Sequence, residues 1–267
     1  MISKWFKRIY DKRDTSYDLF INKVFYDKDS KYWTHRKWGH KKIALKFGLC
    51  LKMVLSSMKA QNLVPENCEK SRKWKAYTKK SKDPINTAPN LLKNQETNKI
   101  EFIANKSLEK ICLDISELKI KNKKIYLFVY IDIYSRLPLI TYFANNQTNE
   151  ELINSMQLLV AKYDVKNSII HTDRGSQFRS LIMKEFCNNY NIIQSMTDGY
   201  ASWQNSIVET FFKSIKQNYY VGYKFEDDGT FINWMKDCVW NYSNNRIINK
   251  LKNTPKEIFE SNLLKYM

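Results

Sequence analysis

The feature that most constrains the fold is an apolar segment near the middle of the chain. Seven apolar residues run without interruption from Ile125 to Ile131 and are closed by Asp132. A helix that spans a bilayer needs about 20 such residues, so this run is far too short to cross a membrane. We therefore expect a buried strand over residues 124–132.

The segments around this strand predict the rest of a sheet. Short apolar patterns predict five strands in all, at residues 108–118, 124–132, 137–143, 168–171 and 191–195. The second and third strands lie close enough to form a hairpin. Helical spacing predicts a helix over 149–163, and further helices are expected after Ser176 and from about Ser202. This order predicts an α/β fold, a mixed five-stranded sheet with flanking helices.

The helix after Ser176 is expected to use that serine as its N-cap. Its apolar residues are then expected to point inward: Phe178, Leu181, Ile182, Cys187 and Tyr190.

The positive charge is concentrated in the first part of the chain. The formal net charge is +18, and residues 1–100 supply +15 of it, from 24 Lys and Arg against 9 Asp and Glu. This asymmetry favours a polyanionic partner, most simply nucleic acid. A solvated basic surface or contact with acidic lipid are the alternatives. Five widely spread cysteines without a C-x-x-C motif predict neither a zinc site nor a disulfide framework, and so a reducing, intracellular location.

Residues 1–62 form the expected basic helical region. Within it, residues 31–62 predict two short helices separated by Gly48, which can serve as a turn or C-cap. Two basic helices joined by a tight turn fit a helix-turn-helix, and a plain basic helical hairpin fits equally well.

Residues 63–105 are expected to form a basic linker. They contain three prolines and the cluster Arg72, Lys73 and Lys75, with Trp74 and Tyr77 interleaved. Such a cluster can follow a phosphate backbone while an aromatic ring stacks on a base. An exposed tether with solvated charges is an equally good interpretation.

Three acids fall at positions suited to chemistry. Asp173 lies at the end of a predicted strand, where functional residues of α/β sheets gather. Asp114 lies within the first strand, and Glu209 lies on the helix that starts near Ser202. Asp132 and Glu117 are instead expected to be a turn carboxylate and a solvent-facing strand residue. His171 is expected to pack or to form a hydrogen bond.

The helix that carries Glu209 has two distinct faces. Ile207, Val208, Phe211, Phe212 and Ile215 form its apolar face. The opposite face carries Asn205, Glu209, Lys213 and Lys216. That face suits a metal ligand beside a DNA backbone, although an ordinary solvated helix face explains it as well.

Two segments carry a family resemblance. Residues 171–178 read HTDRGSQF, and residues 205–212 read NSIVETFF. Together they resemble the integrase core of bacterial insertion-sequence transposases, most closely the OrfB product of the insertion-sequence-three family, which is related to retroviral integrases. That family carries an Asp, Asp, Glu triad with 35 residues between the last two acids. Asp173 and Glu209 meet this spacing, and Asp114 matches the first acid.

The resemblance covers most of the chain. Residues 31–62 resemble the family's N-terminal helix-turn-helix region, and residues 88–92 resemble the segment before the core. The C-terminal signature is matched by Tyr242, Arg246, Leu251, Thr254 and Pro255. The chain departs from the usual pattern at Ile111, Leu113, Gln204, Ser243 and Ile248.

The resemblance implies an RNase H-like catalytic core over residues 106–260 and a DNA transposase activity. It implies that Asp114, Asp173 and Glu209 are both catalytic residues and metal ligands. Three carboxylates without a Cys or His cluster suit Mg²⁺ or Mn²⁺, and two such ions can serve phosphoryl transfer. Water as the nucleophile gives nicking, and a DNA 3′-hydroxyl gives strand transfer. Residues expected to contact DNA are Asn205, Lys213, Lys216, Arg246, Arg72, Lys73 and Lys75.

The family also implies partners and a location. We expect DNA as the substrate, multimers of this chain on DNA, a first-frame protein of the same element as partner, and a nucleoid-associated place in a bacterial cytoplasm, without a membrane. Two alternatives stay open. One is an RNase H-like nuclease without strand transfer, and the other is a decayed transposase that only binds DNA.

Overall fold

The computed structural model describes residues 15–26, 38–65, 86–120, 123–199, 201–216, 225 and 227–265. The chain divides into two compact units. The first contains residues 1–72 with 247–252, and the second contains residues 73–246 with 253–267. The cluster Arg72, Lys73 and Lys75 lies outside the described residues.

Three short helices build the described part of the first unit: α2 (Asp18–Phe25), α3 (His40–Phe47) and α4 (Leu51–Ala60). Ile21, Ile43 and Val54 are fully buried between them. Gly48 ends α3 with φ +63°, a left-handed conformation that glycine adopts without strain. The predicted pair of helices around Gly48 is therefore confirmed, whereas α2 was not predicted.

The second unit contains the predicted sheet. Its strands are β1 (Lys110–Ile120), β2 (Lys123–Asp132), β3 (Pro138–Ala144), β4 (Ile169–Thr172) and β5 (Ile193–Met196). They lie in the order β3-β2-β1-β4-β5. The pairs β1–β2 and β2–β3 are antiparallel, and β1–β4 and β4–β5 are parallel. The mixed five-stranded sheet is thus confirmed.

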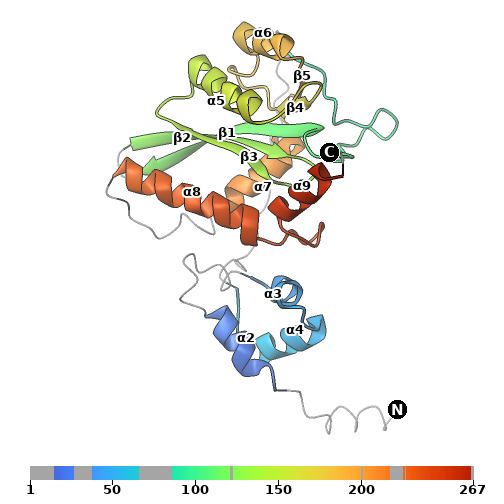
Figure 1. Ribbon diagram of the computed structural model, residues 1–267, viewed down its shortest axis with the longest axis vertical. Helices are drawn as coiled ribbons and strands as arrows, with labels where there is room; N and C mark the ends of the chain where they lie inside the picture. Colours follow the sequence, from blue (N-terminus) through green and yellow to red (C-terminus); the bar gives the residue numbers. More distant parts are fainter. Residues whose placement is uncertain are drawn as a thin grey trace. The chain divides into compact units, whose positions relative to one another are not determined.

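Helices cover both faces of this sheet (Figure 1). On one face lie α5 (Asn149–Lys162) and α6 (Leu181–Asn189), and on the other lie α7 (Ser206–Ile215) and α8 (Asp228–Asn245). The core under α5 and α6 joins apolar residues of the helices to those of β1 and β2, among them Leu113, Tyr130, Leu152 and Cys187.

The last helix, α9 (Pro255–Leu263), ties the end of the chain to the sheet. The ring of Phe259 packs edge-on against Tyr163 at the end of α5, with 5.9 Å between ring centroids. The side chain of Asn262 accepts a hydrogen bond of 2.7 Å from the backbone N–H of Ser107, just before β1. The core cluster is therefore completed by the last helix.

The turn from β2 to β3 is organised by Asp132. This carboxylate is fully buried and accepts hydrogen bonds from the Ser135 N–H at 2.8 Å and the Leu108 N–H at 2.9 Å. Asp132 is thus the turn carboxylate that the sequence predicts. Glu117, also as predicted, faces solvent and pairs with Lys124 at 3.0 Å.

The start of α6 differs from the prediction. The helix begins at Leu181, and its N-cap is Ser180, which accepts a hydrogen bond from the Met183 N–H. Ser176 instead lies in the turn after β4. Phe178 and Cys187 are buried as predicted, together with Met183 and Phe186. Leu181, Ile182 and Tyr190 were predicted to point inward but face solvent.

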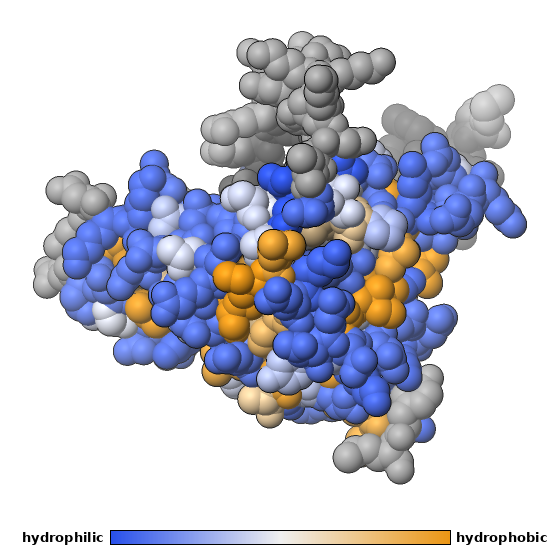
Figure 2. Space-filling model, turned by 90° about the horizontal axis from the view of Figure 1, so that it is seen from above, coloured by the Kyte–Doolittle hydropathy of each residue, from blue (hydrophilic) through white to orange (hydrophobic). Residues whose placement is uncertain are grey.

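The surface seen from above is mostly hydrophilic with apolar patches between (Figure 2).

Residues 86–105 belong to the second unit and pack along it rather than hanging free. The Met196 N–H donates to the Pro89 carbonyl at 3.2 Å, and the Leu91 N–H donates to the Ser195 hydroxyl at 2.9 Å. This part of the expected linker therefore covers the end of β5. Among the described residues, no helix is long and apolar enough to cross a membrane.

Candidate active site

Asp114 lies in the middle of β1, just beyond the point where β4 stops pairing with it. The parallel register ends at Cys112 opposite His171, so β1 is no longer paired with β4 from Leu113 onward. The Asp114 carboxylate accepts a hydrogen bond of 2.8 Å from the Ile115 N–H. Burial raises its pKa to about 7, and the negative charges of Asp173 and Glu209 add to that rise.

Asp173 follows β4 directly and is half-buried in a tight turn. Its carboxylate accepts a hydrogen bond of 2.8 Å from the Gly175 N–H. A Cβ atom on Gly175 would lie 3.0 Å from the Asp173 carboxylate and 3.2 Å from the Phe178 ring. A glycine is therefore needed where the backbone approaches the acid so closely.

Glu209 lies in the first turn of α7 and is exposed. The helix is anchored by its apolar face, because Val208, Phe211 and Ile215 are buried. Asn205 just before the helix is also buried, and its amide donates a hydrogen bond of 3.3 Å to the Leu113 carbonyl. The polar face predicted from the helical wheel thus holds for Glu209, but Asn205 is directed into the protein.

The three acids come from the central strand, its parallel neighbour and a helix, and they act on one another electrostatically. Both Asp173 and Glu209 raise the pKa of Asp114, so the three carboxylates lie near enough to influence one another's charge. Across the described residues, no three His, Cys, Asp or Glu side chains are gathered closely enough to form a ready metal-binding cluster.

Two of the predicted DNA-binding lysines follow Glu209 on α7. Lys213 is exposed one turn later. Lys216 at the end of the helix is half-buried, which lowers its pKa, while the negative charges of Asp114 and Glu117 oppose that change. Lys216 therefore places a positive charge beside the acids. Arg246 lies at the end of α8, with its guanidinium 5.1 Å from the centre of the Tyr242 ring.

His171 is fully buried on β4, and its pKa is lowered to about 4 by that burial. Its Nδ1 atom lies 2.8 Å from the Ser195 hydroxyl, which also accepts the hydrogen bond from the Leu91 N–H. A neutral ring that accepts the Ser195 proton satisfies both contacts. This histidine is thus a hydrogen-bonding core residue, as the sequence predicts.

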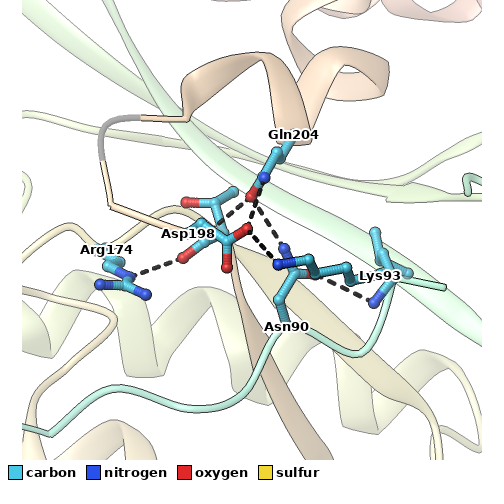
Figure 3. A network of polar contacts seen from close by, with 7 residues as sticks. Asn90, Lys93, Arg174, Asp198 and Gln204 are labelled. Atoms are coloured by element: carbon cyan, nitrogen blue, oxygen red, sulfur yellow. Dashed lines mark hydrogen bonds and ion pairs between the residues drawn. The ribbon is translucent and has the colours of Figure 1, made fainter. Parts of the chain in front are cut away.

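One group of polar residues beside the site was missed by sequence reasoning. Asn90, Lys93, Asp198 and Gln204 form a connected network (Figure 3). The sequence singled out Gln204 as a departure from the family pattern, and it placed Asn90 in a segment that resembles the family. Nothing in the sequence pairs the two, because 114 positions separate them.

Known proteins share this core. Residues 104–202 match the family described as Integrase core domain. An uncharacterised transposase-like protein of Haemophilus influenzae is 27% identical over 183 residues, which cover 68% of this chain and 81% of that protein. Transposase InsF for insertion sequence IS3A of Escherichia coli is 28% identical over 167 residues, covering 62% of this chain and 54% of InsF. The chain thus spans about half the length of that relative.

Among solved structures, a chain of the simian T-cell lymphotropic virus intasome in complex with PP2A regulatory subunit B56 gamma has the same fold. The TM-score is 0.50 and the identity 19%, over 83% of this chain and 74% of that chain. The family match and the shared fold define the class of the second unit: it contains an integrase core domain with the RNase H-like fold. Beyond residues 104–202 the likeness is to insertion-sequence transposases such as InsF, which the chain resembles over 62% of its own length.

Proposed function

We propose that this protein is a transposase that cleaves the ends of its element and joins them to target DNA, using Asp114, Asp173 and Glu209 with divalent metal ions. The observation that carries the proposal is the mutual effect of the three carboxylates, in which Asp173 and Glu209 both raise the pKa of the buried Asp114. Carboxylates that repel one another in a folded protein are stabilised by a cation between them.

The donor set fits Mg²⁺ or Mn²⁺, because it offers carboxylate oxygens only and His171 is engaged in the core. Asp114, Asp173 and Glu209 would hold the metal, and the exposed Glu209 would close on it from α7. When bound, two such ions supply activation of the attacking oxygen and stabilisation of the leaving oxygen.

The chemistry is a displacement at phosphorus. Attack by water forms one P–O bond, breaks the bond to the neighbouring nucleotide and leaves a DNA 3′-hydroxyl. Attack by that 3′-hydroxyl on target DNA exchanges one phosphodiester for another. Lys216, held beside Asp114, would balance the negative charge of the phosphate, and Lys213 would bind the backbone next to it.

Further DNA contacts are proposed for the basic first unit, for Arg72, Lys73 and Lys75, and for Arg246. Asn205 is buried, so we propose that it supports the DNA-binding surface through its bond to the Leu113 carbonyl of β1. Because two element ends must be joined, we propose that the chain works as a multimer on DNA, together with a first-frame protein of the element. The proposed location is the nucleoid in a bacterial cytoplasm.

The test is cleavage and joining of an oligonucleotide that carries an element end, with Mg²⁺ or Mn²⁺. We expect wild type to do both, Asp114→Asn, Asp173→Asn and Glu209→Gln to do neither, and the exposed control Asp164→Asn to match wild type. Full activity in excess EDTA would overturn the metal-dependent mechanism. Cleavage without joining would identify the nuclease alternative, and binding without either step would identify a DNA-binding protein.

A further inference from the structure

Gln204 lies at the centre of a polar network just before α7 (Figure 3). Its side-chain carbonyl accepts hydrogen bonds from the Asp198 N–H at 2.6 Å and from the Asn90 amide at 2.9 Å. Its amide N–H donates to the Asp198 carboxylate at 2.9 Å, and Lys93 pairs with the same carboxylate at 3.5 Å. Only 3% of Gln204 is exposed, whereas the Lys93 and Asp198 side chains are partly exposed, so the bonds of Gln204 form at the buried side of the network.

The network joins three segments that are distant in sequence. Asn90 and Lys93 come from the segment before β1, and Asp198 and Gln204 come from the segment between β5 and α7. A third link reaches the turn that holds Asp173, because the Arg174 side chain donates a hydrogen bond of 2.7 Å to the Thr197 carbonyl. The segment that leads into α7 is therefore bonded to the turn after β4 at one end and to residues 90–93 at the other.

The position of Glu209 depends on how the start of α7 is held in place. In the described chain, no side chain caps the N-terminus of α7. Glu209 is exposed and bears the same charge as Asp114 and Asp173, so electrostatic repulsion drives it away from them. The residues just before α7 are anchored by the bonds of Gln204 and by the bond from Asn205 to the Leu113 carbonyl.

We propose that Gln204 is a positioning residue for the third acid. Its bonds to Asn90 and Asp198 fix the entry of α7, so that Glu209 faces Asp114 and Asp173 against their mutual repulsion. The inference rests on the proposed function and deepens it. The segment before β1, which contains Asn90 and Lys93, thereby helps to organise the active site.

The experiment compares full-length Gln204→Met with wild type. Methionine retains the size of the side chain and removes its hydrogen bonds. Gln194→Met is the matched control, because Gln194 is a half-buried glutamine of β5 that donates one bond to the Phe178 carbonyl and takes no part in the network. Three quantities are measured: the Mn²⁺ concentration that gives half of the melting-temperature shift, and kcat and KM for cleavage of an element-end oligonucleotide.

We expect Gln204→Met to need a roughly tenfold or higher Mn²⁺ concentration and to lose kcat by a similar factor, because small displacements of a ligand are costly. KM for DNA should change little, since the residues that bind DNA are untouched. A purely structural role would lower the melting temperature without changing the Mn²⁺ requirement. Equal Mn²⁺ requirements in Gln204→Met, Gln194→Met and wild type would overturn the inference.

A pair of substitutions tests the network itself. Gln204→Glu sets a carboxylate against Asp198 and should impair the Mn²⁺ response severely. Adding Asp198→Asn lets the new amide donate to the new carboxylate, which restores the bond with its direction reversed, so the double variant should regain most of the response. Failure of this rescue would contradict the inference. Should Gln204→Met not fold, Asn90→Ala, which removes the bond to Gln204 and a local bond from the Leu92 N–H, must raise the Mn²⁺ requirement.

These outcomes separate the two claims. Wild type that shows neither a Mn²⁺-dependent melting shift nor cleavage would overturn the proposed function and this inference with it. Wild type that shows both, with Gln204→Met unchanged, would overturn the positioning role alone.

Discussion

At the scale of single residues, Asp114 is under two opposing demands. Metal binding needs its carboxylate ionised, whereas burial and the neighbouring acids hold its pKa at about 7. The fold therefore carries an electrostatic cost at this residue in the absence of metal, a pattern common where function and stability compete. That cost has two measurable effects, one on pH dependence and one on metal binding.

The first effect concerns pH. In the unfolded chain Asp114 ionises near its ordinary pKa of 3.8, and in the fold near 7. Between these values the folded state binds the extra proton, so this contribution to stability is full below pH 3.8 and is lost as the pH rises through 7. Urea unfolding of metal-free protein should show Asp114→Asn gaining on wild type between about pH 5 and pH 8. His171, with its lowered pKa, acts in the opposite direction in both proteins and cancels. A constant difference between the two proteins would contradict the raised pKa.

The second effect concerns metal. Asp173→Asn removes one of the repelling charges, so the metal-free variant should melt no lower than wild type. An ion that binds only the folded state adds about 2.7 kcal/mol of stability at a hundredfold excess over Kd. Wild type should gain from Mn²⁺ and Asp173→Asn should gain much less, as measured by melting curves with and without the ion. Equal shifts would mean that Asp173 is not a ligand.

At the scale of elements, the turn after β4 is shaped around Asp173. Gly175→Ala would bring a methyl group within 3.0 Å of the Asp173 carboxylate and 3.2 Å of Phe178. We expect this variant to fold, with a melting temperature a few degrees lower at most, and to need more Mn²⁺ for its melting shift, because the carboxylate is displaced. Gly39→Ala is the control, since a Cβ there meets no atom within 4 Å. If both variants respond to Mn²⁺ alike, the turn tolerates the methyl group.

Elements with local signals were predictable, and those set by distant contacts were not. The strands and α5 follow from apolar patterns within a few residues. The turn position of Asp132 and the strand position of Glu117 follow from the same local patterns. The start of α6 was misplaced because two serines four residues apart can each cap a helix, and the turn around Asp173 and Gly175 decides between them. The helical wheel placed Asn205 on the polar face of the helix. In the structure Asn205 is buried, and its amide bonds the Leu113 carbonyl of β1.

At the scale of the whole molecule, the charge asymmetry predicts how the protein binds DNA. Lys41, Lys46 and Lys52 are exposed on or beside α3 and α4. If the first unit supplies most of the sequence-independent affinity, changing these lysines to Gln should flatten the plot of log K against log salt by about 0.9 for each phosphate that is no longer neutralised. The control changes Lys162, Lys166 and Lys184 of the second unit. Equal slopes for the two triple variants and wild type would contradict this prediction and would mean that the basic surface of the first unit is only solvated.

The contact between α9 and the start of β1 has a consequence for synthesis. Asn262 bonds Ser107 and Phe259 packs on Tyr163, so the unit that carries the acids is closed only by its last helix. Ribosomes add roughly 5–20 residues each second, so a growing chain spends many seconds with Asp114 exposed to solvent while Glu209 and α9 are still unmade. Under the proposed function, a nascent chain that has not yet formed α7 and α9 lacks both the third acid and the helix that closes the core, so we expect it not to cut nearby DNA.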